Sequence, residues 1–501
     1  MNKSQASKTR SGTDKNMIGS SGRDRQKTVV ILVCMLPVII ASFIFTVTLF
    51  LHRVYSNMMI EAILFIIRSA AGGLAAEDII SGIEYTLLGI LIAGGICFLL
   101  IRFYKKSRII LFIVMSFMLL TGSAAWFSSE TGFWGYLAIK RQNSTIYEDH
   151  YVEPDDSILK FPDKKRNLIY IYLESMENTY ASVENGGLFD IDYMSGLTDL
   201  TKESDSVSFS NTDTLGGASA FVPSISYTMG ATVAQTSGVA TDTLLFPLFS
   251  RAKFPPVKRL EDILHDNGYS QLYIEGSKGE FSMYDKYVGR YDDSRIFDIK
   301  SALERGYVDE KGDYIWKWGI EDQKLYEIAK ELITKMSEED RPFFVTLYTM
   351  DTHTFECGHR CANCDSGIKK DYLAAVDCSS RLTVEFVNWI KRQPFFENTT
   401  IILSGDHLGN EKTTGLKFDD GYERTIYNCI INPAVQPVSV RNRLFSSLDM
   451  FPTTLSAIGV RIKGDRLGLG TDLFSSTETL CEELGEEKYI TELEKHHNYW
   501  D

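Results

Sequence analysis

Positive charge and cysteine are both scarce in this chain. Its 501 residues include 52 Lys and Arg against 66 Asp and Glu, which gives a formal net charge of −14. A protein that binds nucleic acid is expected to present a basic surface, so we expect no nucleic acid among the partners. Eight cysteines are too few for a disulfide scaffold of this length.

Long apolar runs are lacking after the first quarter of the chain. The mean hydropathy of −0.09 excludes a polytopic carrier as a description of the whole. Three runs are apolar and long enough to cross a bilayer, at residues 29–51, 85–103 and 109–126. Residues 58–76 are interrupted by Glu61 and Arg68, so we interpret them as an interfacial or re-entrant helix, with a full span as the alternative.

Basic residues mark one side of these runs as cytoplasmic. Residues 1–28 are polar, carry seven Lys and Arg, and are expected to form a disordered tail. Residues 102–108, between the second and third runs, carry four more. Because cytoplasmic loops are enriched in Lys and Arg, three spans would place everything after Trp126 outside the cytoplasm. We therefore expect a multi-pass protein of the cytoplasmic membrane whose large domain is extracytoplasmic.

From residue 165 onward the sequence has the pattern of a soluble α/β domain. Strands are expected in the apolar runs at residues 167–173, 269–274, 343–350, 401–403 and 426–431. Amphipathic helical stretches lie between them, for example at 257–267 and 323–336. This alternation predicts a largely parallel sheet covered by helices on both faces. The expected parts are a tail (1–28), a transmembrane region (29–127), a linker (128–164), the α/β domain (165–475) and a C-terminal tail (476–501).

Three of the expected strands end in residues that can bind a metal. Glu174 follows the first strand, His353 the third, and Asp406 with His407 the fourth. Each residue alone is also compatible with a helix-capping acid or an ordinary loop histidine. Because parallel strands bring their carboxyl ends to one edge of a sheet, we expect these side chains to lie together. Carboxylates and imidazoles are good ligands for a divalent metal.

A hydroxyl-rich segment, residues 224–238, supplies a candidate nucleophile. It is expected to be a loop that enters a helix near Thr228. Backbone N–H groups and the helix dipole favour a bound phosphate at such a position. A metal or a base can activate a threonine hydroxyl there. Thr232 is the rival nucleophile, and Thr228 can alternatively be no more than a helix cap.

These motifs together resemble a known family. In chain order they are Tyr172-Leu173-Glu174-Ser175, Tyr227-Thr228, Asp351-Thr352-His353, Ser404-Gly405-Asp406-His407, Arg424, and residues 448–454 and 464–470. Over residues 165–475 the chain resembles the membrane-anchored phosphoglycerol transferases of the alkaline phosphatase and sulfatase superfamily. Relatives in that group are lipoteichoic acid synthase and the transferase that decorates periplasmic glucans. An alkaline-phosphatase-like catalytic domain is the fold that this resemblance implies.

The resemblance also implies a site and a reaction. One divalent metal would be held by Glu174, Thr228, Asp406 and His407; manganese is expected, with magnesium or zinc as alternatives. Thr228 would take phosphoglycerol from phosphatidylglycerol and release diacylglycerol, and His353 would hold the phosphate or protonate the leaving group. A glycan or glycerol-phosphate hydroxyl would then accept the phosphoglycerol. The alternatives are a phosphoethanolamine transferase of the same superfamily and an inactive relative that acts as a membrane binding or sensing module.

The sequence departs from family patterns in two places. The synthase branch has Trp and Arg near the substrate glycerol phosphate, where residues 279–283 offer neither, and Lys278 or Arg290 are the possible substitutes. Sulfatases proper carry a Cys or Ser followed by x-Pro-x-Arg at the nucleophile. No such pattern follows Thr228, so sulfate ester hydrolysis is not expected.

Cysteines cluster just after His353. Cys357, Cys361 and Cys364 have a spacing that can bind zinc together with His359. An extracytoplasmic location favours disulfides instead. We expect at least one disulfide near the His353 loop, and its pairing cannot be read from the sequence.

Overall fold

The chain folds into two compact units, Met1–Tyr55 with Ala76–Phe133 and Ser56–Ala75 with Trp134–Asp501, which we call the helical unit and the globular unit. The computed structural model describes residues 14–55, 59–68, 76–103, 105–241, 254, 256–280, 283–291, 294–310, 312–316, 319–353, 361, 364, 368, 371–410, 414, 416, 418, 421–497 and 499.

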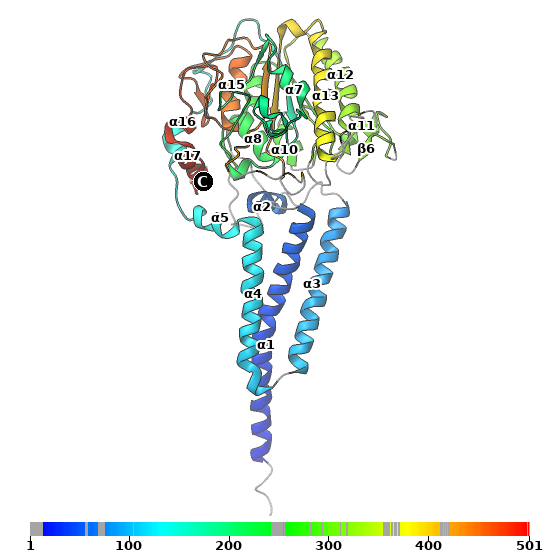
Figure 1. Cartoon of the computed structure of the whole chain (residues 1–501), viewed down its shortest axis with the longest axis vertical. Coiled ribbons are helices and arrows are strands. Elements are labelled where there is room, and N and C mark those ends of the chain that lie inside the picture. The colour runs from blue at the N-terminus through cyan, green and yellow to red at the C-terminus, as the bar shows by residue number, and fades with distance from the viewer. Residues whose placement is uncertain are drawn as a thin grey trace, which may run out of the picture. The chain divides into compact units, whose positions relative to one another are not determined.

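Three long helices make up the helical unit (Figure 1). They are α1 (Asp14–Phe50), α3 (Ala76–Arg102) and α4 (Ile109–Thr131), and α1 packs against both of the others. Stretches long and apolar enough to cross a membrane lie at Ile31–Arg53, which runs from α1 into the short π-helix η1 (Leu51–Tyr55), at Ile79–Arg102 and at Ile109–Thr131. These are the three apolar helices that the sequence predicts. α1 begins inside the expected tail, because extending an existing helix costs far less than starting one.

A twisted sheet forms the centre of the globular unit. Within the part of the chain that the structure describes it has seven strands in the order β3-β10-β9-β2-β8-β4-β5. Their bounds are β2 Asn167–Leu173, β3 Ser206–Val207, β4 Ser270–Glu275, β5 Arg295–Phe297, β8 Phe343–Tyr348, β9 Thr399–Gly405 and β10 Asn428–Ile431. The five strands from β9 to β5 are parallel, and β10 runs antiparallel to both of its neighbours.

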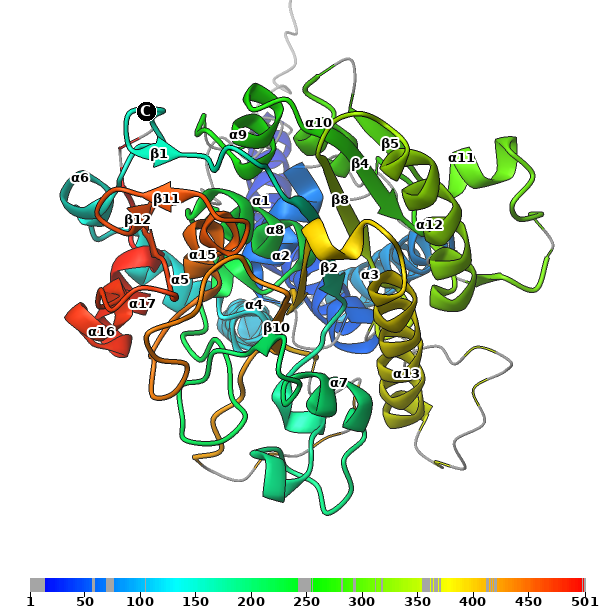
Figure 2. The same cartoon turned by 90° about the horizontal axis from the view of Figure 1, so that it is seen from above.

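Helices cover both faces of this sheet (Figure 2). Successive side chains of β2 point to opposite faces, so the even-numbered Leu168, Tyr170 and Tyr172 and the odd-numbered Ile169, Ile171 and Leu173 enter different cores. The first core includes α8 (Thr228–Ser237), α9 (Leu260–Asp266) and α15 (Met450–Ala457). The second includes α7 (Ser195–Leu200), α12 (Asp322–Ser337) and α13 (Asp371–Lys391). The predicted α/β architecture is confirmed.

The segments on either side of this core are also structured. Residues 128–164, expected as a linker, include α5 (Phe133–Lys140), α6 (Ile146–His150) and β1 (Leu159–Lys160), which pairs with β11 (Arg461–Ile462). Residues 476–501, expected as a tail, include α16 (Leu480–Leu484) and α17 (Glu486–Glu494). Cys481, Tyr489 and Leu493 of these two helices are buried in the first core because they carry the apolar face of the segment.

The short helix α2 (Ile60–Arg68), from the segment between the first two apolar helices, belongs to the globular unit. Ile60, Ala62 and Leu64 are buried. The helix packs against a short turn of 3-10 helix, η5 (Pro223–Ile225), which precedes Thr228. α2 therefore supports the segment that leads into the candidate nucleophile.

A disulfide joins Cys364 to Cys378, as the disulfide interpretation of this cluster expects. The Sγ atom of Cys361 lies 3.5 Å from that of Cys378. Cys357 and His359 lie outside the described residues.

Candidate active site

Two neighbouring parallel strands bring the predicted metal ligands together. The register of β2 and β9 pairs Leu173 with Gly405, so the residues that follow, Glu174 and Asp406, leave the sheet side by side. One ligand atom each from Glu174, Asp406 and His407 lies within 4.8 Å of the others. The strand-end pattern in the sequence is the signal that predicts this group.

Asp406 shows that the group fits a cation. Its Oδ1 accepts hydrogen bonds from the backbone N–H groups of Ser175 and His407, both at 2.8 Å. Its Oδ2 is buried, lies 3.3 Å from Nε2 of His407, and accepts no hydrogen bond among the described residues. A buried carboxylate oxygen without a donor is costly unless a cation satisfies it. An oxygen and nitrogen ligand set of this kind suits a divalent metal.

The ligands are held in position by their neighbours. Nδ1 of His407 lies 3.0 Å from the carbonyl oxygen of Leu408, so a proton on Nδ1 leaves Nε2 available for a metal. Nε2 is 3.7 Å from Oε1 of Glu174. Ser175 donates to that oxygen at 2.7 Å, and Thr352 donates to the backbone carbonyl of Glu174 at 2.6 Å. Contacts of this kind fix the direction in which a ligand points.

The electrostatics of the group also favour a bound cation. Burial, together with the nearby Asp406 carboxylate, raises the pKa of Glu174 to about 8. Burial alone would lower the pKa of His407, but the charges of Asp406 and Glu174 outweigh it and raise that pKa. A divalent cation would offset the repulsion between the two carboxylates.

The backbone around the ligands is unusually tight. Ser175 has a φ of 50°, a left-handed conformation that costs free energy for a residue with a side chain. A Cβ atom on Gly405 would lie 2.1 Å from the carbonyl oxygen of Met176, so only glycine allows this close approach. The Ser404-Gly405-Asp406-His407 motif is thereby explained: glycine lets β9 deliver its two ligands next to the turn after β2.

Thr228 is the first residue of α8 and faces Glu174, one of the three candidate metal ligands. Its Oγ1 lies 3.5 Å from Oε2 of Glu174. Gly230 permits this placement, since a Cβ atom there would be 2.3 Å from the carbonyl oxygen of Ser224 in η5. Thr232, the rival, is 1% exposed, and its hydroxyl donates to the carbonyl oxygen of Thr228 at 2.8 Å. The two hydroxyls thus have different surroundings: one faces the metal group and the other satisfies the helix backbone.

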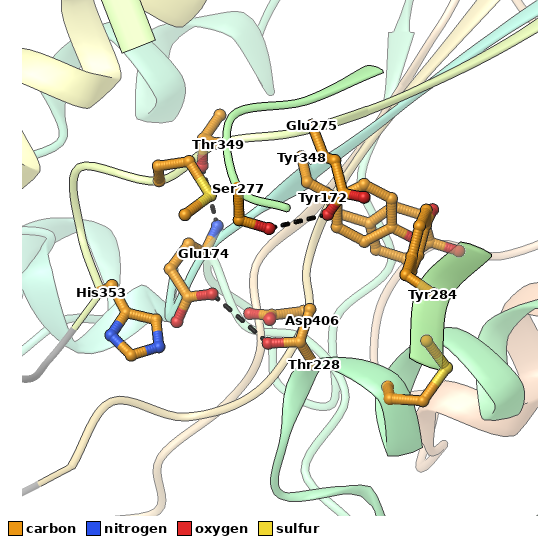
Figure 3. Close-up of a pocket in the computed structure, with 12 residues that line it drawn as sticks. Tyr172, Glu174, Thr228, Glu275, Ser277, Tyr284, Tyr348, Thr349, His353 and Asp406 are labelled. Atoms are coloured by element: carbon orange, nitrogen blue, oxygen red, sulfur yellow. Dashed lines mark hydrogen bonds between the residues drawn. The ribbon is translucent and has the colours of Figure 1, made fainter. Parts of the chain in front are cut away.

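Glu174, Thr228 and Asp406 line a pocket that is partly open to solvent (Figure 3). Glu174, Thr228, Asp406 and His353 all contribute to its wall. His353 lies just after β8, and its backbone N–H donates to the carbonyl of Met350 at 3.1 Å. The four predicted strand-end and helix-start residues therefore line one cavity.

Two expected substrate contacts are not brought to this pocket. Lys278 is exposed, and Nη1 of Arg290 lies 3.4 Å from Oδ2 of Asp262. Neither is among the described residues that line the cavity. Glu275 and Tyr284 line it instead, and sequence reasoning assigned them no role. The strand-end rule was the available signal for Glu275, because it is the last residue of β4.

Arg424 connects the later part of the motif set to the site. Its Nε donates to Oε2 of the fully buried Glu177 at 2.8 Å. Glu177 in turn accepts a hydrogen bond from the backbone N–H of Gly409 at 3.1 Å. This ion pair anchors the loop that follows His407, so Arg424 acts on the site through the backbone.

Comparison with known proteins agrees with this geometry. The sequence model of the family described as Sulfatase matches residues 166–460, more than half of the chain. The chain belongs to the sulfatase family. Relatives named phosphoglycerol transferase I include one from Escherichia coli (strain SMS-3-5 / SECEC), 27% identical over 359 residues, which is 67% of this chain and 42% of that protein. Another, from Citrobacter koseri, is 29% identical over 290 residues, 54% of this chain and 34% of that protein. The chain spans less than half the length of these relatives.

Solved structures of the superfamily are similar as well. One is the lipoteichoic acid synthase LtaP from Listeria monocytogenes, with 17% identity and a TM-score of 0.46 over 66% of this chain and 81% of that chain. The other is an alkaline phosphatase superfamily protein from Vibrio parahaemolyticus, with 21% identity and a TM-score of 0.48, also over 66% of this chain. The resemblance to phosphoglycerol transferases of the alkaline phosphatase and sulfatase superfamily is confirmed by the family match and the named relatives.

Proposed function

We propose that this sulfatase-family protein transfers a phosphate-linked headgroup from a membrane phospholipid to a hydroxyl acceptor through a covalent intermediate on Thr228. The observation that carries the proposal is that the Thr228 hydroxyl, at the start of a helix, faces the Glu174 carboxylate of a three-residue metal group within one pocket. Helix N-termini bind phosphate well, and metal groups beside a hydroxyl are typical of phosphoryl transfer.

Glu174, Asp406 and His407, with the Thr228 hydroxyl, would hold one divalent cation. Manganese is the ion we propose, with magnesium or zinc as alternatives. The ion would supply positive charge beside the phosphoryl oxygens and the attacking hydroxyl.

The chain's own side chains account for the rest of the reaction. Oγ1 of Thr228 forms a bond to phosphorus, and its proton passes to Oε2 of Glu174, which lies 3.5 Å away. The oxygen of diacylglycerol leaves with the electron pair of its bond and takes a proton from His353, which lines the same pocket. In the second step an acceptor hydroxyl gives its proton to His353 and its oxygen bonds to phosphorus, while the Thr228 oxygen leaves with the electron pair of its bond and regains its proton from Glu174.

The donor and the acceptor follow from the relatives and the membrane segments. Phosphatidylglycerol is the donor that the name of the relatives implies. Phosphatidylethanolamine is the second candidate, favoured by a carboxylate in the pocket wall. A surface or periplasmic glycan is the acceptor that we propose. Three apolar helices would place the globular unit at the outer face of the cytoplasmic membrane, close to its lipid donor.

The test is release of diacylglycerol from vesicles by the full chain. Vesicles containing both lipids, labelled in their acyl chains, are incubated with the protein and Mn²⁺, with or without a chelator. We expect diacylglycerol with the metal, and none after chelation or with Thr228→Ala. No release with manganese, magnesium or zinc would contradict the proposal and favour an inactive binding relative.

A further inference from the structure

Glu275 is a buried carboxylate in the wall of the pocket that contains Thr228 (Figure 3). It is the last residue of β4 and is 5% exposed. Its Oε2 accepts a hydrogen bond from Ser277 Oγ at 2.9 Å. Its Oε1 is buried and has no hydrogen-bond partner among the described residues. An unsatisfied buried carboxylate oxygen is costly, so a ligand that donated a hydrogen bond to this atom would be stabilised by it.

The surroundings of Glu275 are negative. A Cβ atom on Gly279 would lie 3.6 Å from Oε1 of Glu275 and 3.4 Å from Oδ2 of Asp298, so these two carboxylates flank Gly279. Burial, with added repulsion from Asp298 and Asp285, raises the pKa of Glu275 to about 8. The described residues that line the pocket include no Lys or Arg. This side of the pocket therefore disfavours a second anion and favours a positive charge.

The spacing of these carboxylates favours an organic cation over a metal ion. Among the described residues that line or border this pocket, Glu174, Asp406 and His407 have ligand atoms close enough together to share one metal ion. Glu275 is not part of this group. A metal ion needs several ligand atoms at short distances. An ammonium group needs only separate hydrogen-bond acceptors around it.

Aromatic rings complete this side of the pocket. Tyr284 meets Tyr348 edge to face, with ring centroids 4.8 Å apart, and Tyr348 stacks on Tyr172 at 4.5 Å. All three tyrosines line the cavity. Tyrosine rings attract cations through their faces, and their apolar bulk lowers the local dielectric, which strengthens the attraction of a carboxylate for an ammonium.

We infer that Glu275 and the neighbouring tyrosines form a subsite for a donor headgroup that carries an ammonium group, as phosphoethanolamine does. The inference rests on the proposed function, because it assumes that Thr228 attacks the phosphorus of the same headgroup. Two carbons and one oxygen separate phosphorus from nitrogen in phosphoethanolamine, so both ends must fit in one cavity. Thr228 and Glu275 line the same pocket, as this requirement demands.

The experiment compares the two lipids as donors for the full chain in the presence of Mn²⁺. Diacylglycerol release is followed from vesicles that contain phosphatidylethanolamine or phosphatidylglycerol, each in a neutral phosphatidylcholine background. We expect wild type to release diacylglycerol faster from phosphatidylethanolamine, which would make this lipid the donor in place of phosphatidylglycerol. Glu275→Gln keeps the size of the side chain and removes its charge, so it should lower release from phosphatidylethanolamine by about tenfold or more. Release from phosphatidylglycerol, whose headgroup carries no ammonium group, should fall by a much smaller factor.

Glu280→Gln is the matched control. Glu280 is exposed, pairs with Lys300, and does not line the pocket, so its substitution removes one nearby negative charge without touching the subsite. It should leave the donor preference in place. Metal content of each variant shows whether its site is still assembled.

The outcomes separate this inference from the proposed function. A wild-type preference for phosphatidylglycerol would overturn the inference and leave headgroup transfer standing. If Glu275→Gln then also slowed release from phosphatidylglycerol, the carboxyl would be a partner for glycerol hydroxyls instead. Release from neither lipid would overturn the inference together with the proposed function.

Discussion

At the scale of single residues, the two oxygens of Asp406 have separate tasks. Oδ1 accepts two backbone N–H groups and so fixes the turn after β9, whereas the buried Oδ2 has no donor among the described residues. Only the second oxygen is available to a cation. The local fold therefore depends on Oδ1 of Asp406, and the candidate metal site depends on Oδ2 of the same side chain.

This division predicts the effect of Asp406→Asn. The amide keeps an oxygen for the backbone donors and replaces the charged ligand oxygen, so metal affinity should fall by at least about tenfold while the fold survives. Metal content after purification, measured by mass spectrometry, gives the answer. Glu275→Gln, which changes none of the three candidate ligands, should have the metal content of wild type. Wild-type metal content in Asp406→Asn would show that the ion binds elsewhere.

The sequence predicted residues better where strand direction alone decides their position. Glu174 and Asp406 follow two buried parallel strands, so a pattern of apolar runs was enough to bring them together. Glu275 also ends a strand, but its role depends on which neighbours leave one of its oxygens unsatisfied. That property arises from packing among β4, Gly279 and Asp298, and no local pattern carries it.

At the scale of elements, β10 and α2 also have properties that arise from packing and cannot be predicted from the local sequence pattern. The apolar run at 426–431 predicted a strand, but its antiparallel direction depends on how the chain returns after the His407 loop. The interfacial interpretation of residues 58–76 rested on its charged interruptions. The structure buries Ile60, Ala62 and Leu64 of α2 within the globular unit, and the interfacial interpretation stays a prediction. Amphipathicity indicates that a face will be covered, and it does not say by what.

Acidic residues on α2 and α17 lead to a prediction about how folding stability depends on pH. Burial, and then the charge of Glu61 on α2, raise the pKa of Glu494 on α17 to about 7, while Lys140 opposes the shift. A carboxyl whose pKa is higher in the folded state holds its proton longer there, so folding stability falls as pH rises from about 4.5, the ordinary value, to about 7. Glu494→Gln should remove this loss.

The measurement is the melting temperature of the full chain in detergent at pH 5 and pH 8. Relative to wild type, Glu494→Gln should gain more stability at pH 8 than at pH 5. Glu487→Gln, on an exposed position of the same helix, serves as the control and should show no such difference. A constant gap between wild type and Glu494→Gln at both pH values would contradict the coupling.

At the scale of the whole molecule, orientation in the membrane decides which lipids and acceptors the pocket meets. A three-span topology would keep the basic residues at 102–108 and those among residues 1–28 on the cytoplasmic side. An alkaline phosphatase fused after the globular unit should therefore be active, and the same reporter inserted at residue 105 should be silent. An active reporter at 105 with a silent C-terminal fusion would reverse the orientation.

The central proposal is a covalent intermediate on Thr228, and peptide mass mapping would detect it directly. The full chain is incubated briefly with Mn²⁺ and donor vesicles, quenched in acid and digested. We predict the mass of the phosphate-linked headgroup on Thr228, which faces Glu174, and no adduct in Thr228→Ala. Thr232, whose hydroxyl bonds to the helix backbone, should stay unmodified. An adduct on Thr232, or diacylglycerol release by Thr228→Ala, would contradict this assignment.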